Sequence, residues 1–161
     1  MHSRDEAWDA LNHNFKSLMD CLGKLTVEEL TTTQVEGIWT VKDVMAHVWS
    51  WDDEAVRTAK EWTGPRQWQK ELSEDEDAWN EAQVANRAAL MLIPVVDGLT
   101  GAHRRLMHLL DTFSDEALEQ VAKAPWGDEM ALVDFFFEMA DHYTTHMAAL
   151  KLYQEKCLSC D

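Results

Sequence analysis

Two histidines near the C-terminal end of the sequence, His142 and His146, lie four residues apart in the segment DHYTTHMAAL. On a helix this spacing brings the second side chain back to within roughly 40° of the first. The Cβ atoms of such residues are about 5–6 Å apart, so both imidazoles can reach one metal ion. His47, in the segment VMAHVWSWD, lies on a second strongly helical stretch and could supply a third ligand. The histidine spacing therefore indicates a metal site that joins two distant helices.

Three imidazoles on one divalent ion are typical of a catalytic site, because they leave coordination positions for water or substrate. Imidazole nitrogens bind Zn, Ni, Fe or Cu, so the ligand type does not select one metal. A bound ion would lower the pKa of water toward about 7 or activate a substrate thiolate. Asp43 and Glu138 each lie one helical turn before a predicted ligand, where a carboxylate could orient an imidazole. The alternative, which the sequence favours for both, is a solvated acid on a helix surface. We expect Trp51 and Tyr143 to line a pocket beside the site.

The motifs of other chemistries are missing from the sequence. Tyr143 stands where the HExxH motif of metalloproteases requires its glutamate, so that activity is not supported. Neither a G-x-S-x-G motif nor a glycine-rich phosphate loop is present. His103 and His108 are separated by about 140° around a helix and cannot chelate together. Two further hypotheses stay open: a bundle that binds or sequesters a small molecule, with any metal incidental, and a bundle whose histidines are only packed and hydrogen-bonded.

Long amphipathic helices must position these side chains. Apolar residues recur at three- and four-residue spacing between capping signals such as Ser3 with Glu6 and Thr40 with Asp43. The pattern predicts helices over residues 3–23, from Thr40 to near residue 62, from Ser73 toward residue 92, and from about residue 131 to residue 156. Short helical turns are expected at TVEEL and SDEAL. No alternating apolar run predicts a strand. The fold class is therefore all-α, a helical bundle with short connecting helices.

Pro94 interrupts the helical pattern between residues 73 and 113. Either one helix is kinked at this proline, or a new helix begins with Pro94 in its first turn. Gly98 and Gly101 follow, and their missing side chains would permit close approach of a neighbouring helix.

The length of 161 residues predicts a single domain, which we place at residues 1–156. Residues 157–161 form the expected C-terminal tail, which holds Cys157 and Cys160. A structural zinc site needs about four ligands, and no second C-x-x-C completes one. A redox dithiol would need more nearby positive charge than Lys156 supplies, so a frayed tail is the better interpretation.

Thirty acidic and fourteen basic side chains give a net charge of −16. Such a balance repels phosphate backbones and anionic bilayers, so we expect neither nucleic acid nor a membrane as a partner. No apolar run approaches the roughly 18 residues of a membrane span, and the N-terminus does not read as a signal peptide. A cytoplasmic protein that acts on a small molecule is the resulting expectation.

The segment GIWTVKDVMAHVWSWDDEAV resembles the second helix of the DinB/YfiT-like metalloenzyme superfamily, in which a tryptophan precedes a helix with one metal-binding histidine. ADHYTTHMAAL resembles the last helix of that family, which carries two histidines as H-x-x-x-H. DAWNEAQVANRAAL is similar to its ClbS/DfsB-like branch. The resemblance implies a four-helix bundle with a site of His47, His142 and His146, often as a homodimer. It also implies a divalent metal (Zn, Ni or Fe), and transferase, isomerase or hydrolase-type chemistry that can use a low-molecular-weight thiol.

Overall fold

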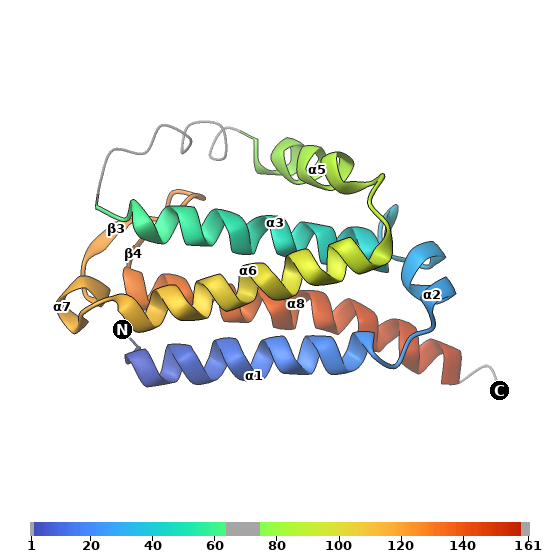
Figure 1. Ribbon diagram of the computed structural model, residues 1–161, viewed down its shortest axis with the longest axis horizontal. Coiled ribbons are helices and arrows are strands. Elements are labelled where there is room, and N and C mark those ends of the chain that lie inside the picture. Colours follow the sequence, from blue (N-terminus) through green and yellow to red (C-terminus); the bar gives the residue numbers. More distant parts are fainter. Residues whose placement is uncertain (1, 64–74, 159–161) are drawn as a thin grey trace.

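Four long helices form a bundle in the computed structural model, which describes residues 2–63 and 75–158 (Figure 1). They are α1 (Arg4–Leu22), α3 (Val41–Lys60), α6 (Leu92–Thr112) and α8 (Leu132–Leu158). Helix α1 packs along α8, and α3 packs along α6. Helices α3 and α6 run in one direction, whereas α1 and α8 run in the opposite one. The expected all-α four-helix bundle is confirmed, and both packed pairs, α1 with α8 and α3 with α6, consist of parallel helices.

The helix starts follow the capping signals of the sequence. The side chains of Ser3 and Glu6 form a reciprocal capping box at α1, and Thr40 and Asp43 form one at α3. Two short connecting helices, α2 (Val27–Thr32) and α7 (Asp115–Leu118), also begin directly after a hydroxyl cap. Each box satisfies backbone donors that the first helical turn leaves without partners. The local sequence thus sets where each of these helices begins.

The apolar stripes predicted from spacing form the core. The predicted seam of α3 is buried along its whole length: Val41, Val44, Val48, Trp51, Ala55 and Ala59. Helix α8 buries apolar residues on several sides, and Phe136, Tyr143 and Leu150 have no exposed surface. Such a helix belongs at the centre of a bundle.

Two small hairpins correct the expectation that the chain has no strand. Strand β1 (Gln34–Glu36) pairs with β2 (Trp39–Thr40), and β3 (Val121–Lys123) pairs with β4 (Glu129–Ala131), both antiparallel. Their turns contain Gly37 at φ 56° and Gly127 at φ 102°, where a side chain would be strained. Strands of two or three residues are too short to show apolar alternation, so the pattern did not reveal them.

The third predicted helix starts and ends at different residues from those expected. Its proposed cap, Ser73, lies outside the described residues. Helix α5 (Glu76–Arg87) begins after Asp75, whose side chain accepts a hydrogen bond from the Ala78 backbone N–H. Helix α6 is separate and has Pro94 in its first turn, where a missing N–H costs no helical hydrogen bond. Of the two alternatives at Pro94, a new helix is therefore the one observed.

The C-terminal boundary also moves. Helix α8 continues to Leu158, two residues past the expected end, so Cys157 belongs to the helix rather than to a tail, and Cys160 lies outside the described residues. In the part of the chain that the structure describes, no helix combines the length and the apolar character that crossing a membrane requires.

Candidate metal centre

Helix α3 carries His47 into the interior of the bundle. The start of this helix is held by the Thr40–Asp43 capping box. The imidazole ring of His47 packs near the indole of Trp39 on strand β2, with ring centroids 5.0 Å apart. Only 4% of the residue is exposed. The burial of the apolar seam of α3 sets the rotation of the helix, and His47, three residues after Val44, therefore also faces the interior.

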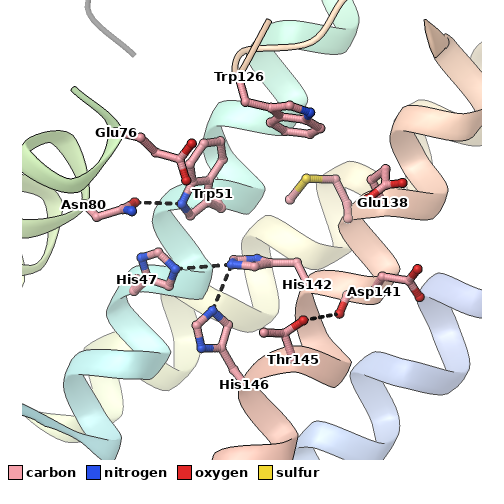
Figure 2. A pocket seen from close by; sticks show the side chains of 11 residues that line it. His47, Trp51, Glu76, Asn80, Trp126, Glu138, Asp141, His142, Thr145 and His146 are labelled. Atoms are coloured by element: carbon pink, nitrogen blue, oxygen red, sulfur yellow. Dashed lines mark hydrogen bonds between the residues drawn. The ribbon is translucent and has the colours of Figure 1, made fainter. Parts of the chain in front are cut away.

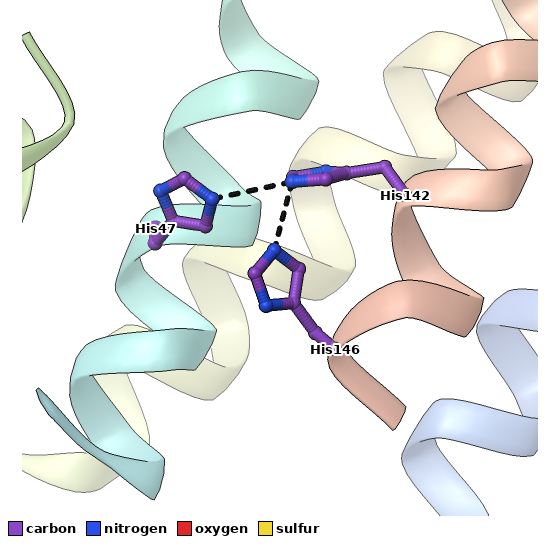
Figure 3. A group of neighbouring side chains, drawn as sticks. All are labelled: His47, His142 and His146. Atoms are coloured by element: carbon purple, nitrogen blue, oxygen red, sulfur yellow. Dashed lines mark hydrogen bonds between the residues drawn. The ribbon is translucent and has the colours of Figure 1, made fainter. Parts of the chain in front are cut away.

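Helix α8 presents His142 and His146 to the same point (Figure 3). The Nε2 atom of His142 lies 3.2 Å from Nε2 of His47 and 2.9 Å from Nε2 of His146. All three ligand atoms lie within 4.8 Å of one another. The structure therefore brings together the three histidines that the sequence singled out, although position 47 is 95 residues from position 142.

The donor set fits a divalent metal ion. Two imidazole nitrogens at about 2.0–2.1 Å from one ion lie roughly 3 Å apart in common coordination geometries. Both Nε2 separations from His142 have that length, and the three ligand atoms as a set span up to 4.8 Å. Burial, followed by the proximity of His146, lowers the pKa of His47 to about 3. Burial likewise holds the pKa of His142 well below its usual value. Both rings are thus neutral at pH 7, the state in which imidazole binds a metal.

Glu36, on strand β1, is the carboxylate that contacts a histidine of this cluster. Its Oε1 atom lies 2.7 Å from Nδ1 of His146. The Nδ1 atoms of His47 and His142 are also buried, but neither has a partner among the described residues. A carboxylate on Nδ1 favours the tautomer with its proton on that nitrogen, which leaves Nε2 free to bind a metal. Spacing gave no signal for Glu36, because a hairpin rather than a helix brings it to the site.

The two carboxylates expected to orient the histidines lie elsewhere. Asp43 accepts hydrogen bonds from the backbone and the hydroxyl of Thr40, so its carboxylate serves the helix cap. Glu138 is exposed and lines the pocket beside the histidines, and it has no hydrogen bond to them within the described chain.

The two expected pocket residues differ in outcome. Trp51 lines the pocket, as predicted. Tyr143 does not; it is fully buried, donates a hydrogen bond of 2.8 Å to Oδ2 of Asp52, and lies 3.0 Å from Nδ1 of His103. It faces the bundle interior because residue 143 is turned by about 100° from its neighbour on α8. Tyr143 therefore joins three helices instead of contacting a ligand.

A pocket of about 390 Å³ opens onto the histidine cluster (Figure 2). Its walls come from α3, α5, α8 and the turn between β3 and β4, and its lining includes Glu76, Asn80 and Trp126, which the sequence analysis did not identify. The Nε1–H of Trp51 donates to Oδ1 of Asn80 at 2.9 Å. The volume suits a small molecule. A small molecule in this pocket would lie beside the three histidines that line it.

Comparisons with known proteins agree with this architecture. The crystal structure of a mycothiol-dependent maleylpyruvate isomerase is similar, with a TM-score of 0.74 at 12% identity, covering 92% of this chain and 61% of the isomerase. A histidine variant of that isomerase gives a TM-score of 0.75 at the same identity and coverage. This chain thus spans about three fifths of the isomerase.

YfiT from Bacillus subtilis, described as a probable metal-dependent hydrolase with an unusual four-helix bundle topology, has a TM-score of 0.72 at 20% identity. That match covers 96% of this chain and 87% of YfiT. At these identities the structures show a shared fold. A search of curated proteins gives no match. The family model of the DinB superfamily matches residues 5–150, and this chain therefore belongs to the DinB superfamily.

Proposed function

We propose that this protein is a metal-dependent enzyme that acts on a small molecule by hydrolysis or by transfer of a group to or from a low-molecular-weight thiol. The observation that carries the proposal is the convergence of three imidazoles at an open pocket. Two proteins of the same fold, one described as a probable metal-dependent hydrolase and the other a mycothiol-dependent isomerase, support the same class of chemistry.

Each residue has a defined part in this proposal. His47, His142 and His146 hold the ion through Nε2, and Glu36 keeps the ring of His146 in the required tautomer. A divalent ion (Zn, Ni or Fe) supplies positive charge that polarises an electrophile or favours the deprotonated form of water or a thiol. The pocket walls exclude bulk water on the sides formed by Trp51 and Met139 and orient the substrate toward the histidines.

A second candidate function is retention of a small molecule without turnover. The tryptophans that line the pocket favour it, because aromatic walls bind apolar ligands whether or not chemistry follows.

Elemental analysis tests the metal. We expect protein purified without a histidine tag to hold close to one divalent ion, and His47→Ala and His142→Ala to lose it. His13→Ala and His108→Ala are matched controls, since both side chains are exposed and distant in sequence from the cluster. A wild-type protein that is free of metal, and whose melting temperature responds neither to chelator nor to added Zn, would contradict the proposal.

Turnover separates the two candidate functions. Metal-loaded protein is incubated with p-nitrophenyl acetate, and separately with monochlorobimane and cysteine, and products are followed by absorbance or fluorescence. An enzyme gives product in excess of protein, and the rate falls to background in His142→Ala. A protein that only sequesters ligands yields at most one equivalent.

A further inference from the structure

The rim of the pocket is acidic. Three of its lining residues, Glu76 on α5 and Glu138 and Asp141 on α8, carry exposed carboxylates, and no lysine or arginine is among the described residues that line it. None of the three carboxylates forms an ion pair with a cation within the described ranges. The pocket therefore combines three imidazole side chains at its floor with negatively charged side chains at its rim.

Two indole rings, those of Trp51 and Trp126, line the same pocket as these carboxylates and the histidines (Figure 2). The rings of Trp51 and Trp126 meet at an angle of 62° with centroids 6.1 Å apart, so they form a corner rather than a slot. Trp126 is held from behind by Phe135, with ring centroids 5.8 Å apart, and Trp51 is held by its hydrogen bond to Asn80. These contacts fix the two rings in place before a ligand binds. Trp51 is only 6% exposed and also packs against Trp79, with ring centroids 4.8 Å apart, so the half-buried Trp126 presents most of the aromatic surface to a ligand.

The negative face of an indole ring attracts a cation, and nearby carboxylates strengthen the attraction. One exposed carboxylate contributes little, but here three of the same sign surround one partly enclosed pocket, and their fields add. The same charges repel an anionic ligand. The electrostatics of the rim thus distinguish between ligands of the same size by the sign of their charge.

We infer that the substrate of this site carries an alkylammonium group, which lies in the corner of Trp51 and Trp126 under the acidic rim while its reactive end faces the three histidines. The placement of the reactive end at the histidines rests on the proposed function. The cation subsite depends only on the carboxylates of the rim and the two indole rings. Glu138, which the spacing suggested as a partner for a histidine, here contributes to the recognition of charge.

Binding of two matched probes tests this subsite. Benzyltrimethylammonium and phenylmethanesulfonate share a ring, a methylene and a compact head group, but their charges are opposite, and the quaternary ammonium cannot coordinate a metal. We expect calorimetry at low ionic strength to show that the cation binds roughly tenfold more tightly than the sulfonate, or better. This difference in affinity should decrease as salt is added. Equal affinities, or tighter binding of the sulfonate, would overturn the inference.

Charge variants locate the effect at the rim. The triple variant E76Q/E138Q/D141N should lose most of the preference for the cation. The control E28Q/E81Q/D97N makes the same change in net charge at exposed residues that do not line the pocket, and it should keep the preference. If both triple variants lose the preference equally, the attraction belongs to the net charge of the whole protein and the cation subsite is refuted.

Ring variants provide a readout that does not depend on charge. Trp126→Leu should weaken binding of benzyltrimethylammonium several-fold, roughly, and Trp126→Phe should restore much of it, because the phenyl ring keeps an aromatic face. If the leucine and phenylalanine variants bind the cation equally while both melt as cooperatively as the wild type, the rings do not form the subsite.

Metal content measured on the same samples keeps this inference separate from the proposed function. The rim carboxylates could instead serve only to attract metal ions toward the histidines. In that case E76Q/E138Q/D141N would bind metal more weakly, and the wild type would show no selectivity for the organic cation; this result would overturn the inference. Selectivity for the cation in a protein that binds no metal would leave the subsite standing and refute the metal-dependent enzyme.

Discussion

Glu36 Oε1 lies 2.7 Å from Nδ1 of His146, which links the first hairpin to the last helix across 110 residues of sequence. The same hairpin places Trp39 beside His47, so one small element contacts histidines of two helices. We infer that the β1–β2 hairpin, although it adds little to the core, holds the histidine cluster in the arrangement that a metal requires.

Replacing Glu36 tests this relationship directly. Glu36→Ala leaves Nδ1 of His146 without its acceptor, and we expect the dissociation constant for Zn to rise about 10–100-fold. Glu36→Gln keeps a hydrogen-bond acceptor but removes the charge, so a smaller loss is expected. Competition with a chromophoric chelator measures both. Glu28→Ala, an exposed acid on α2, is the control, and a change of less than twofold in Glu36→Ala would refute the role.

The buried hydroxyl of Tyr143 supports the core behind the site. Tyr143→Phe removes the partner that both Oδ2 of Asp52 and Nδ1 of His103 have in the bundle interior. Because buried polar groups without partners are costly, we expect urea denaturation to show a free energy of unfolding lower by about 1–3 kcal/mol. Tyr153→Phe makes the same change at a partly buried residue that bonds to Glu29, and should cost less. Metal content should be unchanged in both variants, since neither tyrosine lines the pocket.

Gly98 permits the close approach of α6 to α3. A Cβ atom at this position would lie 2.5 Å from ring atoms of Trp49. Alanine improves helix propensity by about 1 kcal/mol, but the overlap forces the packed indole to move, so we expect Gly98→Ala to lower stability by about 1–3 kcal/mol.

Gly101→Ala is the matched control for Gly98, because it lies on the same helix and its Cβ would meet only Nη1 of Arg105, at 3.4 Å. Thermal denaturation should show no loss for Gly101→Ala. Equal effects of the two alanines would contradict the packing argument. The sequence suggested close approach at both glycines, and the structure shows it at Gly98.

His103 makes stability depend on pH. Burial, followed by the charge of Arg104, lowers its pKa to about 4 from an ordinary value of 6.5. Between about pH 4 and pH 6.5, His103 binds a proton in the unfolded chain but not in the folded chain. The stabilisation by neutral His103 is therefore complete above about pH 6.5 and is lost as the pH falls toward 4.

Comparison with a variant isolates this titration. Asp52 acts with the opposite sign, since burial raises its pKa, but it is present in both proteins. We expect the stability difference between wild type and His103→Gln to decrease by roughly 1–3 kcal/mol from pH 7 to pH 4.5, measured by urea denaturation. The same measurement on His108→Gln, at an exposed position on the same helix, gives the reference for a histidine outside the core. A stability difference for His103→Gln that does not change with pH would show that this histidine is not held neutral.

Much of the bundle followed from local signals. Capping boxes at Ser3 and Thr40 gave the starts of α1 and α3, and apolar spacing gave their buried faces, because both depend on residues within a turn or two of each other. The hairpins were missed because their strands have two or three residues, and the choice at Pro94 was left open because either helical path satisfies the same local rules.

The sequence by itself determined the helices and the pairing of His142 with His146, since a helical period relates residues four apart without reference to the rest of the chain. It also suggested His47 as the third residue. The tertiary structure decided what surrounds them: the contact of Glu36 with His146, the burial of Tyr143 against Asp52 and His103, and the acidic, tryptophan-lined pocket. These contacts join residues tens of positions apart. Their geometry depends on how whole helices and a hairpin pack together, which the spacing of residues within one helix does not predict.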